Sequence, residues 1–353
     1  MDAFITGAGW ITPHGENLDE VWAAILAGTP PPTRELPGPP GLRPHLAACV
    51  PAALVDAVAR HPRLRRSSNI SLFAAAATLS ALRATGIDPA NPGKCALVFA
   101  ATDGGVIYTR KFYDQVVRQG AGSPLLFPET VYNAPASHIA ALLGLDGSTY
   151  TIVGDASAGL VALSMGVELL ATTGIDHCII ASAQEADWIL GEAYHQWRLA
   201  ADSTSVSKSS RHGALIADGA AALVLSRDGP HRLDAVTPGI PFFRQSEAGS
   251  SLAAALAHLP PGSAPGRVIS CANGTFIDAA ERAAVEAAFG PLPFLHPKAA
   301  LGDPFGAGAL MQIICAVQSL RHDPTAQALV PVIGLNQQAA AAVVSANVDS
   351  PRE

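Results

Sequence analysis

The sequence predicts an α/β fold in which strands and helices alternate in layers. Three short runs, 95–101, 176–182 and 219–226, have apolar centres, and the first is wholly apolar, as buried strands are. Longer alanine-rich or amphipathic runs of helical character lie between such segments along the whole chain. Strands that alternate with helices favour sheets whose faces are covered by helices.

Composition supports a large buried core. The chain has 353 residues, of which 49% are hydrophobic and 14% charged, so it has too little charge to be disordered. No apolar run reaches the ~18 residues of a membrane helix, and no basic region precedes the apolar N-terminus. The net charge of -7 argues against a nucleic-acid binder. We therefore expect no membrane insertion, no signal peptide and no nucleic-acid partner.

The cysteines give no sign of a disulfide framework or a metal site. There are five, they lie far apart, and none forms a C-x-x-C pair. Most stand in apolar runs, which indicates buried, reduced thiols in a cytoplasmic protein. We expect no metal and no cofactor.

The first part of the chain begins with a strand at Phe4–Gly9 and a loop at Trp10–Gly15. The glycines here are not a dinucleotide motif, because Thr12 stands where the third glycine belongs. Further elements follow in order: a helix capped by Asn17 and ended by Gly28, an irregular segment at Thr29–Pro44, a helix after Arg66, a strand at Cys95–Ala101, a helix around Thr109–Gln119, a loop at Ser123–Ser137 and a helix at His138–Gly144.

The stretch Tyr150–Leu170 is the centre of the predicted fold. Tyr150–Val153 reads as a buried strand, a sharp break follows, and small and apolar residues then form a buried helix. Such a turn aims the free N–H groups and the positive dipole end of the helix at whatever lies above it. A nucleophile would stand there, but the turn holds Asp155, Ala156 and Ser157, and no cysteine.

The rest of the chain repeats the alternation. The composition changes near Gly229–Pro230, so we expect two related halves, residues 1–228 and 229–353. The expected elements are a strand at Asp176–Ser182, an aromatic amphipathic segment at Trp188–Trp197, a mobile loop at Ala200–Arg211, strands at Gly219–Ser226, Arg232–Thr237 and Arg267–Ser270, helices at Asp278–Phe289 and Phe305–Leu320, and strands at Ala328–Ile333 and Ala340–Ser345.

Several ordered motifs resemble the β-ketoacyl synthase branch of the thiolase-fold enzymes. The opening F-I-T-G-A-G-W-I-T-P-H-G is one, and the stretch from Phe127 to Ile152 is another. R-H-G-A-L-I-A-D-G-A-A-A-L-V-L at Arg211–Leu225, A-N-G-T at Ala272–Thr275 and P-K-A-A-L-G-D-P-F-G-A-G at Pro297–Gly308 complete the series. The resemblance covers nearly the whole chain. It implies a thiolase-like five-layer αβαβα fold, built of two related β-ketoacyl-synthase-like halves, that normally dimerises.

The resemblance also places the family's functional positions on this chain. The nucleophilic cysteine falls on Ala156, the first catalytic histidine on Asn273 and the second on Asp303. The family's lysine is retained as Lys298 and its threonine as Thr275. Asp278 and Glu281 resemble the acidic pair that follows, and the closing G-F-G-G loop survives only as Gly334-Leu335-Asn336-Gln337-Gln338.

These substitutions remove the chemistry of condensation. Alanine offers no nucleophile to hold the acyl chain. Asn273 can still donate a hydrogen bond to a carbonyl, but an ionised Asp303 would repel a developing oxyanion. We therefore expect neither condensation nor decarboxylation, and no catalytic residue.

Inactive partners of ketosynthases share this pattern. The elbow G-D-A-S-A-G-L at Gly154–Leu160 is similar to the G-E-Q-A-G-G-L of chain-length-factor subunits in type II polyketide systems. The compact C-terminal half is more like the short ketosynthase-like subunits of aryl-polyene or highly reducing systems. The resemblance implies a heterodimer with an active ketosynthase, in which this subunit shapes the acyl tunnel for substrates on an acyl carrier protein of fatty-acid or polyketide biosynthesis.

Two other functions remain open. Ser157 in D-A-S-A-G is close to the G-x-S-x-G elbow, so a stand-alone acyl-thioester hydrolase or acyltransferase is one alternative. A non-catalytic acyl-binding homodimer is the other.

Several polar and aromatic side chains have simpler structural interpretations. Asp155 is expected to cap a helix, and Asn273 and Asp303 to satisfy buried backbone groups. Lys298 needs a partner if it is buried, either Glu281 or Asp303. His138 is expected to be a hydrogen-bonded core histidine, and the sequence leaves open whether Trp188, Tyr194 and Trp197 line the core or an interface.

Overall fold

A single large sheet runs through the molecule. The computed structural model describes residues 3–201, 213–323, 327–335 and 338–347. Within these residues eleven strands form one sheet along the path β11-β10-β12-β13-β8-β1-β7-β6-β4-β5, with β9 beside β13. The strands are β1 Ala3–Ile11, β4 Cys95–Ala101, β5 Thr149–Val153, β6 His177–Gln184, β7 Gly219–Ser226, β8 His231–Val236, β9 Ile240–Pro241, β10 Pro265–Ile269, β11 Phe294–Leu295, β12 Gln327–Ile333 and β13 Gln338–Ala346.

The path consists of two half-sheets with the same strand order. From its edge inwards one half reads β5-β4-β6-β7-β1 and the other β11-β10-β12-β13-β8. In each half the first three strands are parallel and the last two join antiparallel. The halves meet where Ala3–Ile5 of β1 pairs with the start of β8. A repeated unit would give this order, and the exact division at residues 228 and 229 stays a prediction.

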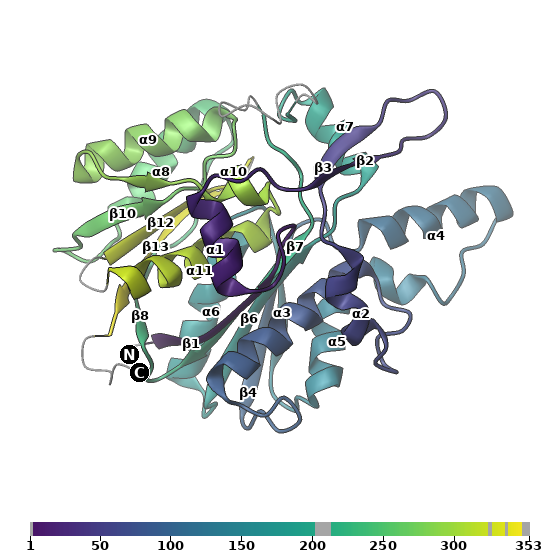
Figure 1. Cartoon of the computed structure of the whole chain (residues 1–353), viewed down its shortest axis with the longest axis horizontal. Helices are drawn as coiled ribbons and strands as arrows, with labels where there is room; N and C mark the ends of the chain where they lie inside the picture. Colours follow the sequence, from purple (N-terminus) through teal and green to yellow (C-terminus); the bar gives the residue numbers. More distant parts are fainter. Residues whose placement is uncertain (1–2, 202–212, 324–326, 336–337, 348–353) are drawn as a thin grey trace.

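Helices form three layers around the half-sheets, as Figure 1 shows. Helices α3 (Asn69–Thr85) and α5 (Ala134–Leu143) cover the outer face of the first half-sheet, and α8 (Ala248–Leu256) and α9 (Phe276–Phe289) that of the second. Helices α6 (Ala158–Thr172) and α11 (Gly306–His322) lie between them. The five-layer α/β fold expected from the sequence is therefore confirmed.

Alternation along the strands explains the layers. In β4, Val98 faces the central helices, whereas Leu97 and Phe99 face α3 and α5. All seven residues of β4 are buried, because helices cover both faces of the sheet. This is why such strands read as unbroken apolar runs in the sequence.

The two central helices pack closely at their N-terminal ends. A Cβ atom on Gly159 of α6 would lie 2.7 Å from the carbonyl oxygen of Gly306 and 2.9 Å from Cβ of Ala309, both in α11. Only glycine allows this approach. It brings the turn that precedes α6 beside the turn that precedes α11, and the candidate site lies over these two turns.

Most predicted elements of the first half are confirmed, with corrections at their ends. Helix α1 (Leu18–Leu26) is capped by Asn17, whose side chain accepts hydrogen bonds from two N–H groups of the first turn. Strand β1 continues to Ile11, so the loop predicted from Trp10 begins too early. The loop predicted at Ser123–Ser137 is also wrong in part, because a short 3-10 helix (η2, Phe127–Thr130) and the first turn of α5 lie there.

The segment Thr29–Pro44 is not wholly irregular. Its residues Thr33–Leu36 form β2, which pairs antiparallel with β3 (His45–Ala48) in a separate two-stranded sheet. The segment was predicted to be irregular because prolines flank this short hairpin. Its buried positions are Leu36 and the end of β3.

Other short elements were not predicted. They are η1 (Ala52–Val55), α2 (Asp56–Ala59), η3 (Gln245–Glu247), α8 and α10 (Pro297–Leu301). Helix α4 (Val106–Gln119) projects from the body and has no buried residue, and α7 is Trp188–Gln196. Most of the loop predicted at Ala200–Arg211 lies outside the described residues.

Strand β5 corrects the most consequential prediction. Tyr150–Val153 is a strand, but it is not buried, because β5 is the last strand of the sheet and pairs with β4 alone among the described strands. Tyr150 is 39% exposed and Val153 54%. Composition indicated a strand but could not show that it stands at an edge.

Two general expectations concern membranes and thiols. Across the described ranges, no helix is long and apolar enough to cross a bilayer. All five cysteines are free, four of them buried and Cys49 partly exposed.

Candidate functional site: the cavity over Ala156

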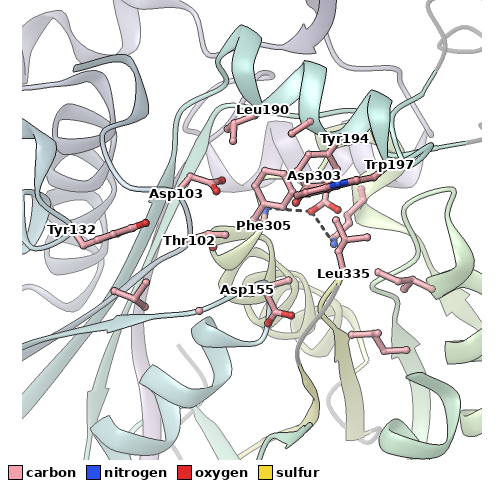
Figure 2. A pocket seen from close by; sticks show the side chains of 17 residues that line it. Thr102, Asp103, Tyr132, Asp155, Leu190, Tyr194, Trp197, Asp303, Phe305 and Leu335 are labelled. Carbon is pink, nitrogen blue, oxygen red and sulfur yellow. Dashed lines mark hydrogen bonds and ion pairs between the residues drawn. The ribbon is translucent and has the colours of Figure 1, made fainter. Parts of the chain in front are cut away.

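A cavity of about 330 Å³ opens over the turn between β5 and α6. Its walls come from the loop after β4, from α7, from the turn before α11 and from the loop after β12, as Figure 2 shows. Of the sequence-predicted site residues it brings together Ala156, Lys298 and Asp303. No local sequence pattern marks other parts of the wall as a site, among them Thr102, Asp103, Tyr132 and Phe305.

Ala156 lies in the turn between β5 and α6, where the resemblance places the nucleophile, and is 6% exposed. The preceding Asp155 is not the formal cap of α6, which begins at Ala158 after Ser157. Its Oδ1 accepts hydrogen bonds from the backbone N–H (3.1 Å) and hydroxyl (2.9 Å) of Ser157. Asp155 therefore fixes the turn just before the helix.

Ser157 does not face the cavity. It is 2% exposed, does not line the cavity, and donates its hydroxyl hydrogen bond to Asp155. No histidine in the described part of the chain is hydrogen-bonded to it. A nucleophilic serine needs a base within reach, so this geometry does not favour the hydrolase alternative.

Asp303 and Lys298 form a buried ion pair at the cavity wall. Nζ of Lys298 lies 2.9 Å from Oδ1 of Asp303, with side chains 5% and 3% exposed. Burial lowers the pKa of Lys298, but Asp303, Cys271 and Glu281 together outweigh burial, so the pKa of Lys298 is raised. Of the two partners predicted for Lys298, the structure selects Asp303.

Asn273 and Thr275 lie behind this ion pair and do not line the cavity. Nδ2 of Asn273 donates to Oδ2 of Asp303 at 2.7 Å, and Oδ1 of Asn273 accepts from the Thr275 hydroxyl at 2.6 Å. Thr275 also caps α9. The Asn273 side chain is thus held by its neighbours, which does not favour a role in polarising a substrate carbonyl.

The two acidic residues after A-N-G-T support the loop that carries Asn273. Asp278 accepts from the N–H groups of Asn273 (2.9 Å) and Gly274. Glu281 accepts from the N–H of Cys271 at 2.7 Å and from the hydroxyl of Ser270. Burial raises the pKa of Glu281 despite these hydrogen bonds.

Aromatic rings close one side of the cavity. The ring of Tyr194 lies 5.1 Å from that of Phe305 and 5.7 Å from that of Trp197, between centroids. Burial raises the pKa of Tyr194, and the nearby carboxylates add to this effect, namely Asp103, Asp303 and Asp155. Tyr194 is therefore the aromatic residue of the cavity that lies near all three of these carboxylates.

The predicted aromatic segment is thus divided between two environments. Tyr194 and Trp197 line the cavity. Trp188 packs in the outer core instead, and its indole N–H donates to the carbonyl of Arg43 at 2.8 Å.

His138 is hydrogen-bonded as predicted, but it is not a core residue, because its side chain is 25% exposed. Its Nε2 lies 2.5 Å from Oε1 of Glu129, and it does not line the cavity. Glu129 also accepts from the backbone N–H of Ser68 at 2.8 Å. This cluster ties α5 to the start of α3.

The degenerate closing loop reaches the cavity through Leu335. Gly334 before it packs against Asp155 so closely that an added Cβ would meet Oδ2 at 1.6 Å. Asn336 and Gln337 lie outside the described residues. A side chain larger than that of glycine would therefore clash with Asp155 at position 334.

The described lining of the cavity contains no cysteine and no histidine. Among these described residues there is also no group of three or more His, Cys, Asp or Glu side chains that could hold a metal ion. The charged groups that remain are carboxylates and one ammonium already paired with a carboxylate. The arrangement favours neither covalent catalysis nor oxyanion stabilisation.

Comparison with known proteins identifies the family. The family model of the β-ketoacyl synthase N-terminal domain matches residues 2–231. A putative polyketide β-ketoacyl synthase 2 of Streptomyces halstedii is 26% identical over 355 residues, 91% of this chain and 85% of that protein.

Two solved structures show the same fold at low identity. The ishigamide ketosynthase/chain length factor aligns with a TM-score of 0.79 and 19% identity, over 98% of this chain and 99% of that one. A type II polyketide ketosynthase, AntDE, bound to its acyl-carrier protein AntF aligns with a TM-score of 0.77 and 15% identity, over the same shares. The chain belongs to the β-ketoacyl synthase family.

Proposed function

We propose that this chain is a non-condensing ketosynthase-like subunit that pairs with an active ketosynthase and helps to shape its acyl tunnel. The observation that carries the proposal is the buried Lys298–Asp303 ion pair beside Ala156. In a condensing enzyme the side chain at position 303 would have to donate a hydrogen bond to an oxyanion. Here Asp303 accepts hydrogen bonds instead, and its carboxylate forms an ion pair with Lys298.

The chemistry of condensation explains why this matters. The acyl group needs a thiolate, and the developing oxyanion needs hydrogen-bond donors. Ala156 offers no thiolate, and both oxygens of Asp303 accept hydrogen bonds from the protein. Any condensing activity of a complex would then reside in the partner.

The free edge of the sheet supports pairing with another subunit. Strand β5 presents unpaired backbone groups, which are a template for another strand. Large apolar side chains are exposed on β5, on α4 and on the segment between α4 and α5. They are Tyr113, Val117, Leu125, Phe127, Val131, Tyr132, Tyr150 and Val153.

The similar proteins are consistent with this role. One is a ketosynthase/chain length factor, and another is a ketosynthase in complex with an acyl-carrier protein. We therefore propose an active ketosynthase as the direct partner and an acyl carrier protein as the bearer of the substrate.

Co-expression tests the proposal. The chain is produced with a ketosynthase encoded beside it, the mixture is separated by size-exclusion chromatography, and malonyl-carrier condensation is measured. We expect a heterodimer and condensation that requires both chains. A homodimer that leaves the product of the ketosynthase unchanged would contradict the proposal and return attention to Ser157 and to acyl binding by this chain alone.

A further inference from the structure

Phe305 has a backbone conformation that non-glycine residues rarely adopt. Its φ is +48° and its ψ -117°. Only Arg198 shares a positive φ among the described residues other than glycine. Such a conformation costs free energy and persists only where the surroundings impose it. Glycine would relieve it, and glycines stand nearby at 306 and 308, so the phenyl side chain must contribute something that offsets this cost.

The ion-pair network holds the backbone of Phe305 in place. The N–H of Phe305 donates to Oδ1 of Asp303 at 3.2 Å, the oxygen that also meets Lys298. Oδ2 of Asp303 is held by Asn273. The residues at two former catalytic positions thus fix the orientation of this one aromatic residue.

The ring of Phe305 is fixed on its other side as well. It is 2% exposed and packs against the ring of Tyr194, with centroids 5.1 Å apart. Aromatic pairs at this distance are favourable beyond their buried area. Ring and backbone are therefore both constrained.

Phe305 shares the cavity with Ala156. Both residues precede the central helices α11 and α6, whose ends touch at Gly306 and Gly159. The position of the nucleophile holds only the small Ala156, whereas the turn that faces it carries the large side chain of Phe305. An acyl thioester that reached Ala156 would have to lie in the space beside this ring.

We propose that Phe305 is a built-in plug that keeps acyl thioesters out of this subunit's own cavity. The inference rests on the proposed function and deepens it: an inactive subunit that excludes acyl groups does not compete with its partner for the substrate. The ligand class concerned is an acyl chain in thioester linkage to a pantetheine arm.

Binding to the isolated full-length chain tests the plug. Octanoyl-pantetheine is titrated by calorimetry into the wild type, Phe305→Ala and Phe305→Leu, with circular dichroism to confirm folding. We expect Phe305→Ala to bind at least tenfold more tightly than the wild type. Phe305→Leu is the matched control, since it keeps an apolar side chain of similar bulk, and should behave like the wild type.

Two results would overturn the inference. One is a folded Phe305→Ala variant that binds the probe no more tightly than the wild type, and the other is a Phe305→Leu control that gains as much affinity as Phe305→Ala. If that variant does not fold, Tyr194→Leu replaces it, because it removes the ring against which Phe305 packs and should also raise affinity. This binding experiment uses the isolated chain without a partner. A negative result would therefore reject the plug but would not bear on the heterodimer, which the co-expression assay tests.

Discussion

The side-chain amide of Asn273 donates a 2.7 Å hydrogen bond to Asp303, a residue thirty positions further along the chain. The resemblance to ketosynthases assigns both positions to catalytic histidines. Here the two side chains bind each other, and Asp303 also binds Lys298. Asn273, Asp303 and Lys298 form a connected network of buried contacts at the cavity wall, and its contribution to stability can be measured.

Asp303→Asn should strongly destabilise the protein. The substitution keeps the size of the side chain but leaves the ammonium of Lys298 buried without its counter-charge. Removal of one partner of a buried ion pair typically costs about 3–5 kcal/mol. Urea unfolding followed by circular dichroism should show a loss of this order.

An exposed ion pair provides the control for this prediction. Arg282 and Glu286 lie 3.4 Å apart on α9, and their side chains are 54% and 47% exposed. Glu286→Gln should cost less than about 1 kcal/mol, because solvent screens the pair. Equal losses for the two variants would show that the buried Lys298–Asp303 pair contributes no more to the free energy of unfolding than an exposed ion pair does.

Glu185→Gln should change how stability depends on pH. Burial raises the pKa of Glu185 from 4.5 to about 7, and the nearby carboxylates of Asp218 and Asp187 contribute in the same direction. The native carboxyl thus keeps its proton to higher pH than the unfolded one. Wild-type stability should therefore fall between about pH 4.5 and pH 7, by at most about 3 kcal/mol.

The variant carries no titrating group at this position, so its stability relative to the wild type should rise over that window. Urea unfolding at pH 5 and pH 8 measures the difference. If the free energy of unfolding of Glu185→Gln differs from that of the wild type by the same amount at both pH values, the pKa of Glu185 is not raised as stated.

The sequence predicted best those strands that helices cover on both faces. Cys95–Ala101 and Gly219–Ser226 were predicted residue for residue, because helices cover both faces of these strands, every position is buried and almost all of the residues are apolar. Asn17 was predicted as a cap because its signal is local. Strand β5 has a similar composition, but its exposure depends on its place at the edge of the sheet, which no local pattern records.

The candidate site divides in the same way. Motif resemblance located Ala156, Asn273 and Asp303, but it left two partners open for Lys298. The choice of Asp303 depends on how the turn before α11 packs against α10. Phe305 gave no signal at all, because its unusual backbone and its contact with Tyr194 exist only in three dimensions.

Val153→Arg should weaken pairing with the partner ketosynthase without unfolding the chain. Val153 is 54% exposed at the end of the edge strand, so a positive charge there is solvated in the free subunit and desolvated in a complex. We expect the dissociation constant, measured by surface plasmon resonance, to rise at least tenfold. Leu26→Arg on α1, where the leucine is 60% exposed, is the control and should leave affinity unchanged. Equal effects of the two variants would argue against β5 as the interface.

Ala156→Cys alone should not restore condensation. The substitution supplies a thiol at the start of α6, where the helix dipole favours a thiolate. The oxyanion would still face the carboxylate of Asp303, and the Asn273 side chain would still be held away from the cavity by Asp303 and Thr275. Malonyl-carrier condensation by the isolated variant should therefore remain at the level of the wild type, while iodoacetamide labelling tests whether the new thiol is accessible. A labelled thiol without condensation locates the defect at positions 273 and 303. Condensation by this single variant would mean that histidines at those positions are dispensable, and the argument for a non-condensing subunit would fail with it.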